Sequence, residues 1–324
     1  MCYSDTLELF REFLEQLKGQ KVVVLGHVRP DGDCIGSQVA MTRVLRLFGV
    51  DAVALNSHNP PRNCQSFIGD TPFYNPDTYD GDERIIVSVD CAAMDRFGKD
   101  LKHLQKNVFA TIDHHISNSG YARYNFVHPE ACATGEVLAE YCFALGVPID
   151  PVIAQALYVG IFTDTVQFSH NVTERVFEVC SRLTGMGADP KAAAGELYSH
   201  ESRAKLKLLG RFLDSLEFHC DGKLCIGRIG NLDWKDTEAT HEDTEGFVDY
   251  ARDIEGVEIG VFLEQYGDQS KGSLRSKEPK HRVDQLAALF NGGGHACAAG
   301  FNPHEPIDSF YPRFLETIKN HFES

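Results

Sequence analysis

The stretch VVVLGHVRPDGDCIGS, residues 22–37, joins an apolar run to a helical pattern through a short turn that is rich in ionisable side chains. A continuous apolar run such as 22–26 is typical of a strand that is buried on both faces of a parallel sheet. Further apolar runs follow at 52–55, 85–90 and 108–113, and segments long enough for helices lie between them. Strands that alternate with helices predict an α/β fold with right-handed crossovers.

The remainder of the chain divides into a helical middle and a different C-terminal part. Helical spacing of apolar residues predicts helices over residues 5–16, 36–48, 134–145, 151–162, 173–186, 190–199 and 202–216. From residue 218 the pattern predicts a hairpin with Asp221-Gly222 at its turn, strands over 258–266 and 271–276, and a closing helix from Ile307. We therefore expect a doubly wound, mainly parallel-sheet domain at 1–198, a helical linker at 199–217 and a smaller α/β domain at 218–324.

The composition is that of an acidic globular chain. Its 324 residues are enough for two domains, and 31 Lys and Arg against 47 Asp and Glu leave a net charge of −16. Such a charge repels long duplex nucleic acid and anionic membranes, so we expect neither as a partner. No apolar run approaches the length of a membrane span, and the ten cysteines include no C-x-x-C pair. These features predict a reduced, cytoplasmic protein that binds anions only beside metal ions or a local basic cluster.

Acids and imidazoles occur where predicted strands or helices end. They are His27, Asp31 and Asp33 after the first strand, Asp90 and the run Asp113-His114-His115 at the ends of later strands, and Asp164 at the end of a helical stretch. Taken singly, each has an ordinary explanation as part of a turn or a helix cap. The carboxyl ends of parallel strands form the ligand crevice of an α/β sheet, and ionisable groups are costly to hold together there unless a cation shares them. Together these residues predict a metal site.

The ligand types indicate which metal it holds. Several carboxylates with two imidazoles form an oxygen-rich set that suits Mn²⁺ or Mg²⁺ better than a thiolate-rich zinc site does. The set exceeds the needs of one ion, whereas two ions about 3.5–4 Å apart, bridged by a carboxylate and a water, would use all of it. Such a pair activates water beside a phosphoryl group, which predicts phosphoester hydrolysis.

A further segment lies in the C-terminal domain. NGGGHACAAGF, 291–301, follows KGSLRSKEPKHR, 271–282, which carries five Lys and Arg against one acid in an otherwise acidic chain. Glycines let backbone N–H groups approach an anion closely, and Arg275 and His295 would add charged contacts. A flexible turn or a helix cap is the alternative explanation for the glycines. The local reversal of charge favours a phosphate-binding segment.

Taken in order, the motifs GHVRPDGDCIGS, SVDCAAMDRFG, DHHISN and GIFTDTVQF resemble those of the DHH phosphoesterases, and SLRS with GGGHACAAGF resembles the DHH-associated domain. The resemblance covers almost the whole chain. It implies two lobes with the active site between them and two Mn²⁺ ions, for which Mg²⁺ could substitute. Length and layout are most similar to the nanoRNase/pAp phosphatase group, which removes mononucleotides from very short RNAs and dephosphorylates 3′-phosphoadenosine 5′-phosphate (PAP). The resemblance therefore implies short RNA or small nucleotides as partners, and it leaves a homodimer open.

Carried over residue by residue, the resemblance assigns the metals to His27, Asp31, Asp33, Asp90, His114 and Asp164. It makes Asp90 the bridging ligand, turns His115 toward the substrate phosphate and gives Asp113 the task of orienting an imidazole. These three are the expected catalytic residues, and Asn118 would also contact phosphate. On the other lobe, the terminal nucleotide would be held by Arg275, Gly293, Gly294 and His295.

Other functions remain open at this stage. A cyclic- or linear-dinucleotide phosphodiesterase and an exopolyphosphatase-like enzyme would share the metal centre and differ in what the second lobe accepts. A non-catalytic nucleotide-binding regulator would lack a metal ligand, and none is missing here. Cys34, Cys91 and Cys297 lie beside motif residues, and small buried hydrophobic side chains are the simplest interpretation of them.

Overall fold

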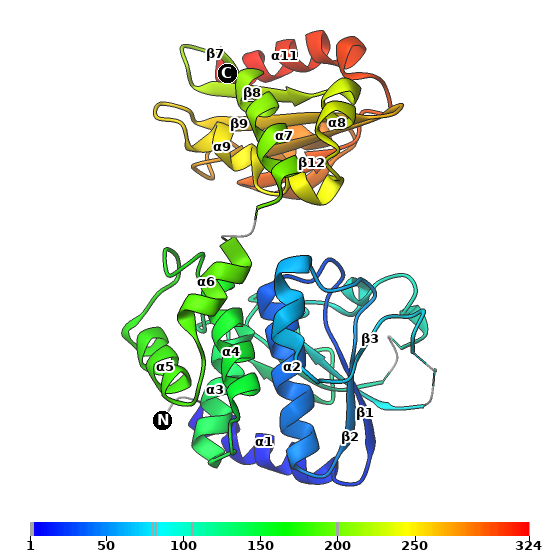
Figure 1. Cartoon of the computed structure of the whole chain (residues 1–324), viewed down its shortest axis with the longest axis vertical. Helices are drawn as coiled ribbons and strands as arrows, with labels where there is room; N and C mark the ends of the chain where they lie inside the picture. The colour runs from blue at the N-terminus through cyan, green and yellow to red at the C-terminus, as the bar shows by residue number, and fades with distance from the viewer. Residues whose placement is uncertain (1–2, 80, 82, 105–106, 199–200, 324) are drawn as a thin grey trace. The chain divides into compact units, whose positions relative to one another are not determined.

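The computed structural model describes residues 3–79, 81, 83–104, 107–198 and 201–323. The chain forms two compact units, residues 1–200 and 201–324 (Figure 1). Each unit has its own sheet and its own hydrophobic core.

The first unit is built on a six-stranded parallel sheet with the strand order β3-β2-β1-β4-β5-β6. Its strands are β1 (Lys21–Leu25), β2 (Asp51–Leu55), β3 (Phe73–Tyr74), β4 (Ile85–Val89), β5 (Val108–Asp113) and β6 (Tyr124–Val127). The four strands predicted from apolar runs are confirmed, and so is the mainly parallel α/β fold. The sequence analysis misses β3 and β6, because β3 has only two residues and β6 alternates buried with partly exposed positions.

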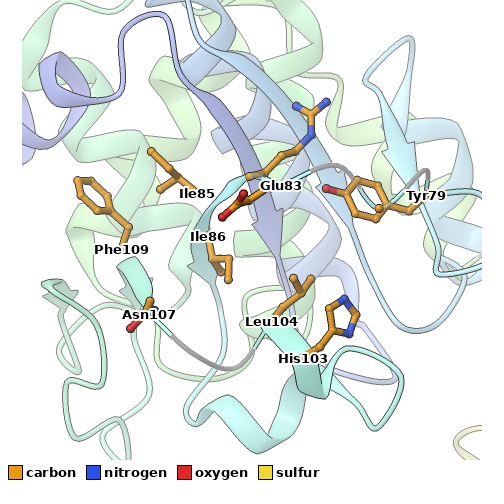
Figure 2. Close-up of a pocket in the computed structure, with 10 residues that line it drawn as sticks. Tyr79, Glu83, Ile85, Ile86, His103, Leu104, Asn107 and Phe109 are labelled. Carbon is orange, nitrogen blue, oxygen red and sulfur yellow. The ribbon is translucent and has the colours of Figure 1, made fainter.

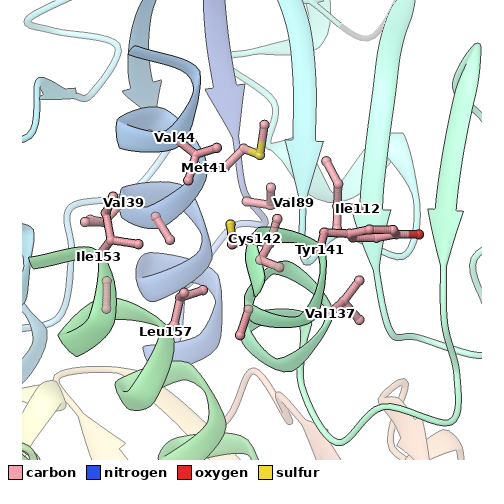
Figure 3. Close-up of a cluster of buried hydrophobic side chains, with 14 of the residues drawn as sticks. Val39, Met41, Val44, Val89, Ile112, Val137, Tyr141, Cys142, Ile153 and Leu157 are labelled. Atoms are coloured by element: carbon pink, nitrogen blue, oxygen red, sulfur yellow. The ribbon is translucent and has the colours of Figure 1, made fainter. Parts of the chain in front are cut away.

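Helices cover one face of this sheet. They are α1 (Ser4–Gln16), α2 (Gly32–Leu47), α3 (Thr134–Leu145), α4 (Pro151–Asp164), α5 (Glu174–Gly185) and α6 (Pro190–Tyr198). Figure 3 shows part of the resulting core, in which Val39 of α2, Val137 of α3 and Leu157 of α4 belong to one buried cluster with Val89 of β4. The helices are therefore held by apolar burial against the sheet, the dominant favourable term in folding.

The opposite face of the sheet carries a smaller apolar cluster. Val23 and Leu25 of β1 pack there with Phe97 and Leu101. Phe97 and Leu101 belong to a region of short 3-10 turns, η2 (Met94–Phe97) and η3 (Lys102–Leu104). Both faces of the central strands are thus buried, which explains why their sequences are continuous apolar runs.

Helix α2 begins four residues earlier than the prediction of a helix from residue 36. Asp31 is its N-cap, and the Asp31 side chain accepts a hydrogen bond from the backbone N–H of Cys34 at 3.0 Å. The glycines in its first two turns, which make the sequence look like a turn, let α2 approach α4. A Cβ at Gly36 would lie 2.2 Å from the Ala156 carbonyl oxygen. The expectation of a loop through Asp33 is therefore wrong, and Asp33 lies in the first turn of α2.

The second unit contains a six-stranded mixed sheet with the order β11-β12-β10-β9-β8-β7, in which only the β8–β9 pair is parallel. Its strands are β7 (Glu217–His219), β8 (Leu224–Ile229), β9 (Ile259–Tyr266), β10 (Gln269–Ser276), β11 (Gly293–His295) and β12 (Ala298–Phe301). The β7–β8 hairpin around Asp221-Gly222 is confirmed. The alternative explanation of 293–295 as a flexible turn or a helix cap does not hold, because these residues form a strand that pairs with β12.

Helices lie on both faces of this second sheet. They are α7 (Arg203–Asp214), α8 (Asn231–Thr237), α9 (Phe247–Asp253), α10 (Val283–Ala288) and α11 (Ile307–Glu323), with a 3-10 turn η4 at His241–Thr244. Helix α7 lies in the range predicted as a linker, and its Leu208 and Phe212 pack with Phe247 and Phe262 in a core of the second unit. Within the described residues no helix is both long and apolar enough to cross a bilayer.

Candidate metal centre

The carboxyl ends of β1, β4 and β5 are neighbours, because β4 pairs with β1 on one side and with β5 on the other. His27 follows β1 by two residues, Asp90 directly follows β4, and Asp113 is the last residue of β5. The strand order reverses between β1 and β4, and ligands of open α/β sheets bind outside the carboxyl ends of the strands at such a point. The sheet thus gathers ionisable groups that are far apart in the sequence.

Asp90 is the central carboxylate of this cluster. Its backbone is in the left-handed region, with φ 50°, and the residue is only 2% exposed. Its Oδ2 lies 3.4 Å from His27 Nε2, whereas its Oδ1 lies 3.7 Å from His114 Nε2 and 3.5 Å from His115 Nδ1. The Thr134 hydroxyl donates a hydrogen bond to Oδ1 at 3.2 Å. The two oxygens of one carboxylate therefore face different imidazoles, as expected of a ligand shared between two cations.

Asp33 is held at the N-terminus of α3. Its Oδ2 accepts the backbone N–H of Thr134 at 2.7 Å, and its Oδ1 accepts that of Gly135 at 2.9 Å. The positive end of the helix stabilises a carboxylate at this position. Gly160 of α4 leaves the space that the carboxylate fills, since a Cβ there would lie 2.4 Å from Asp33 Oδ1. Two helices thus determine where this fully buried side chain lies.

Asp164 and His114 meet across the same cluster. Asp164 is the last residue of α4, and its Oδ2 lies 3.1 Å from His114 Nε2. His114 Nδ1 lies 3.3 Å from the carbonyl oxygen of Ala131. Because a carbonyl oxygen can only accept a hydrogen bond, this contact places a proton on Nδ1. Nε2 is then directed toward the carboxylates, which is the arrangement of a metal-ligating histidine.

Asp113 accepts hydrogen bonds that fix the segment Asp113-His114-His115 and the nearby Asn118. Its Oδ1 accepts hydrogen bonds from the backbone N–H of His114 at 2.8 Å and from His115 Nδ1 at 2.8 Å. Its Oδ2 accepts the side-chain amide of Asn118 at 2.7 Å. The bond to Nδ1 leaves Nε2 of the His115 ring as its outer nitrogen, and the His115 side chain is 31% exposed. The Asn118 amide nitrogen, expected at a phosphate, is engaged with Asp113.

His27 and Asp31 complete the first-unit set. His27 Nε2 lies 3.6 Å from Asp31 Oδ2, and His27 Nδ1 lies 2.9 Å from the carbonyl oxygen of Val28. Two buried amides that the sequence analysis missed support this position. Gln38 donates to carbonyl oxygens at the ends of β1 and β2, at 2.9 Å each, and Asn56 donates to the His27 carbonyl oxygen at 3.1 Å. A glutamine on the buried face of α2 is the only signal that the sequence offers for this support.

Burial and neighbouring charges shift the pKa values of the ionisable groups in this cluster. Burial, and then the neighbouring charges of Asp90 and Asp164, raises the pKa of the Asp33 carboxyl. Burial opposes the charged form of His114, but its hydrogen bond to Asp164 and the surrounding carboxylates outweigh burial and raise its pKa to about 10. The hydrogen bond from His115 to Asp113 raises the pKa of His115. The imidazoles thus carry the positive charge that the carboxylates require.

The same donors fit metal ions. Among the described residues three groups have ligand atoms within 4.8 Å of one another. They are His27 with Cys34 and Asp90, Asp90 with His114 and His115, and Asp33 with His114 and Asp164. Asp90 belongs to two of these groups, and so does His114. The contacts of the Asp90 carboxylate with imidazole nitrogens, at 3.4–3.7 Å, are longer than ordinary hydrogen bonds. The buried charges are therefore only partly satisfied by one another. Oxygen-rich donors in this state suit a hard divalent cation.

The predicted substrate residues of the second unit lie on β10 and on the edge strand β11, which are separated by β12. Arg275 of β10 and His295 of β11 both pair with Ala298 of β12, so they flank the same rung. The guanidinium of Arg275 donates to the Leu274 carbonyl oxygen at 3.0 Å and lies 3.9 Å from Asp249. Gly293 and Gly294 belong to β11 beside His295, and all three are exposed.

A pocket of about 490 Å³ lies elsewhere in the first unit (Figure 2). Ile85, Ile86 and Phe109 line it, so it lies at the amino ends of β4 and β5. The acids and imidazoles described above lie at the carboxyl ends of the same strands. None of them lines this pocket.

Comparisons with known proteins agree with the motif order. Residues 21–161 match the DHH family, N-terminal domain, and residues 221–324 match the DHHA1 domain. A bifunctional oligoribonuclease and PAP phosphatase of Thermus thermophilus is 28% identical over 320 residues, 98% of this chain and 94% of that protein. A protein of the same name from Mycoplasma pneumoniae is 30% identical over 297 residues, 86% of each chain. An exopolyphosphatase-related protein from Bacteroides fragilis has a similar solved structure, with a TM-score of 0.88 and 24% identity over 98% of this chain and 96% of that one.

Proposed function

The chain belongs to the DHH family, and from this premise we propose that it is a metal-dependent phosphoesterase that hydrolyses short oligoribonucleotides to mononucleotides and PAP to AMP. Two relatives that cover most of the chain carry both activities in their names. The observation that carries the proposal is the position of Asp90, whose two oxygens face different imidazoles at the reversal of the strand order. Such a centre serves the hydrolysis of a phosphodiester and of a phosphomonoester alike.

The first unit would hold two Mn²⁺ ions, with Mg²⁺ as a substitute. Six side chains would be the ligands, with Asp90 shared by both ions: His27, Asp31, Asp33, Asp90, His114 and Asp164. When bound, such ions would neutralise charge on a phosphoryl group and lower the pKa of a water molecule. Thr134 and Gly135 would hold Asp33 in place, and the Ala131 carbonyl would keep His114 turned toward the carboxylates.

His115 would meet the substrate rather than a metal. Its Nδ1 donates to Asp113, so Nε2 remains for a phosphate oxygen. Because Asp113 raises the pKa of His115, the ring stays an imidazolium to higher pH than an isolated histidine. An imidazolium can neutralise phosphate charge and can donate a proton to the oxygen of the leaving group.

The second unit would contribute phosphate recognition. Arg275 and His295 flank one rung beside the glycines of β11, where backbone N–H groups and two basic side chains can approach an anion. In a chain of net charge −16 this is a local basic site, which suits a short anionic substrate better than a long one. We place such an enzyme in the cytoplasm, where short RNA fragments are available.

A product profile tests the proposal. The purified protein with Mn²⁺ is given PAP, RNAs of 2 to 24 residues, cyclic dinucleotides and polyphosphate, and products are separated by chromatography. We expect AMP from PAP and mononucleotides from short RNA, with rates highest for about two to five residues. Asp90→Asn, which keeps the size of the side chain, should abolish both reactions without loss of fold by circular dichroism. Turnover of polyphosphate or cyclic dinucleotides alone would contradict the proposed function.

A further inference from the structure

Strand β10 presents a row of polar side chains beyond Arg275. Positions along β10 alternate, with Ser270, Gly272 and Leu274 buried and with Lys271, Ser273 and Arg275 more exposed. Successive side chains of a strand point to opposite faces, so these last three share one face and are spaced by about 6.8 Å along the strand. The function proposed above uses Arg275 and leaves Lys271 and Ser273 unexplained.

The strands beside this row have small side chains on the same face. Ala298 and Gly300 of β12 pair with Arg275 and Ser273, and both are partly exposed. His295 of β11 pairs with Ala298 in turn. A flexible chain can therefore lie against β12 along the row, since the two residues of β12 on this face, Ala298 and Gly300, are small.

A buried carboxylate anchors the far end of the row. Glu264 of β9 pairs with Lys271, is 2% exposed, and among the described residues neither of its buried oxygens accepts a hydrogen bond. Lys271 Nζ lies 3.1 Å from Oε1, and His241 Nδ1 lies 3.5 Å from Oε2. A buried carboxylate is costly without a cation beside it. Glu264 therefore holds the Lys271 ammonium and the His241 ring at this place, although their side chains are 58% and 59% exposed.

Aromatic rings adjoin the anchored lysine. Tyr266 follows Glu264 on the same face of β9 and is 54% exposed. Its ring centroid lies 4.8 Å from that of His241 and 5.6 Å from that of Trp234. Trp234 is buried and donates its indole N–H to the Gln265 carbonyl oxygen at 2.8 Å, so it supports the two exposed rings from below. Exposed rings next to a cation are the usual components of a single-stranded nucleotide site.

We propose that Lys271, with the exposed rings of Tyr266 and His241, forms a subsite for the third nucleotide of an oligoribonucleotide whose terminal phosphate is held by Arg275. Lys271 binds the phosphate and the rings stack on the base. Lys271 and Arg275 are four positions apart in the sequence, about 14 Å along the strand, which is two steps of an extended nucleotide chain. PAP has a single nucleoside and does not reach from Arg275 to Lys271. This inference rests on the function proposed above and names what sets the preferred length of the substrate.

The alternative is that Lys271 and Glu264 form an ordinary structural ion pair. The chain offers a control for that case, because Lys18 of the first unit has a similar side-chain exposure, 50%, and pairs with Glu15 at 2.5 Å outside the basic segment 271–282. Surface pairs of this kind contribute little to stability or binding. A structural role for Lys271 would affect every substrate equally.

The test compares Lys271→Gln, Tyr266→Ala and Lys18→Gln by kcat/KM on PAP, a dinucleotide and a trinucleotide with Mn²⁺ present. For Lys271→Gln and Tyr266→Ala we expect the ratio of trinucleotide to PAP efficiency to fall about tenfold. The ratio should be unchanged in Lys18→Gln, and Tyr266→Phe, which keeps the aromatic ring, should retain the wild-type ratio. The slope of log kcat/KM for the trinucleotide against log salt concentration should lessen by about 0.7 in Lys271→Gln, the value for one lost phosphate contact on a single strand.

Two outcomes separate this inference from the function on which it rests. If wild-type protein cleaves no oligonucleotide, the proposed function and the subsite both fail. If it cleaves normally but Lys271→Gln leaves the trinucleotide ratio unchanged, the subsite alone fails. The double variant Lys271→Gln with Glu264→Gln leaves no buried carboxylate without its cation, and it must show the same fall in the ratio.

Discussion

Replacing Gly160 by alanine should disturb the metal centre, because the added methyl group would displace the carboxylate of Asp33. The new Cβ would lie 2.4 Å from Asp33 Oδ1, which is far inside van der Waals contact. If the carboxylate moves, it loses a hydrogen bond from Thr134 or Gly135, each worth about 1.5–3 kcal/mol because the acceptor is charged. Overpacking adds about 1–3 kcal/mol, and the helix propensity of alanine offsets about 1 kcal/mol of this. We expect a net destabilisation of about 1.5–5 kcal/mol.

The assay is urea unfolding of the metal-free protein together with calorimetric titration of Mn²⁺. Because Asp33 is a proposed ligand, Mn²⁺ should bind about 10- to 100-fold more weakly to Gly160→Ala. Gly195→Ala in α6 is the control, since a Cβ there meets no atom within 4 Å. It should stabilise the fold by about 0.5–1 kcal/mol and leave Mn²⁺ binding unchanged. A Gly160→Ala protein that is as stable as the wild type and binds Mn²⁺ equally well would contradict the role of Gly160 in positioning Asp33.

Three further predictions concern the site itself. Chelation should remove activity and lower the thermal midpoint, and Mn²⁺ should restore both more fully than Zn²⁺ does; full activity in chelator would exclude a metal centre. Arg275→Ala and His295→Ala should each lower kcat/KM on nucleotides, with a loss of transition-state stabilisation of about 2–4 kcal/mol, and should leave the amount of bound Mn²⁺ unchanged. Loss of metal from either variant would show that the residue belongs to the metal centre or the fold and not to a separate phosphate site. Asp113→Asn should lower the pKa of His115, which the Asp113 hydrogen bond raises, so the alkaline fall in the pH–kcat profile should move to lower pH. An unmoved profile would show that His115 is not the titrating group.

The strands that carry the metal centre could be predicted because a strand that is buried on both faces has a continuous run of apolar residues. The runs that became β1, β4 and β5 are apolar throughout, and polar residues follow where each strand ends. Parallel pairing then brings His27, Asp90 and Asp113 to one edge without any need to know the helices. The positions of these residues were therefore accessible from the sequence.

The parts that could not be predicted depend on contacts between distant segments. Glycines in the first two turns of α2 obscured the helix that carries Asp33, because their role is close packing against α4 rather than chain reversal. The hydrogen bonds that hold Asp33 come from α3, about 100 residues away in sequence. The amides of Gln38 and Asn56 support β1 from positions that local propensity does not mark. Strand β11 has little propensity of its own and forms because β12 pairs with it.

The most direct test of the account is the number of Mn²⁺ ions bound by the metal-free protein and by Asp90→Ala, measured by calorimetric titration with elemental analysis. The structure gives Asp90 one oxygen toward His27 and the other toward His114. We expect two ions in the wild-type protein and weaker binding of both in Asp90→Ala, because a shared ligand is lost from each. A wild-type protein that binds no Mn²⁺, or an Asp90→Ala variant that keeps two ions at unchanged affinity, would contradict it.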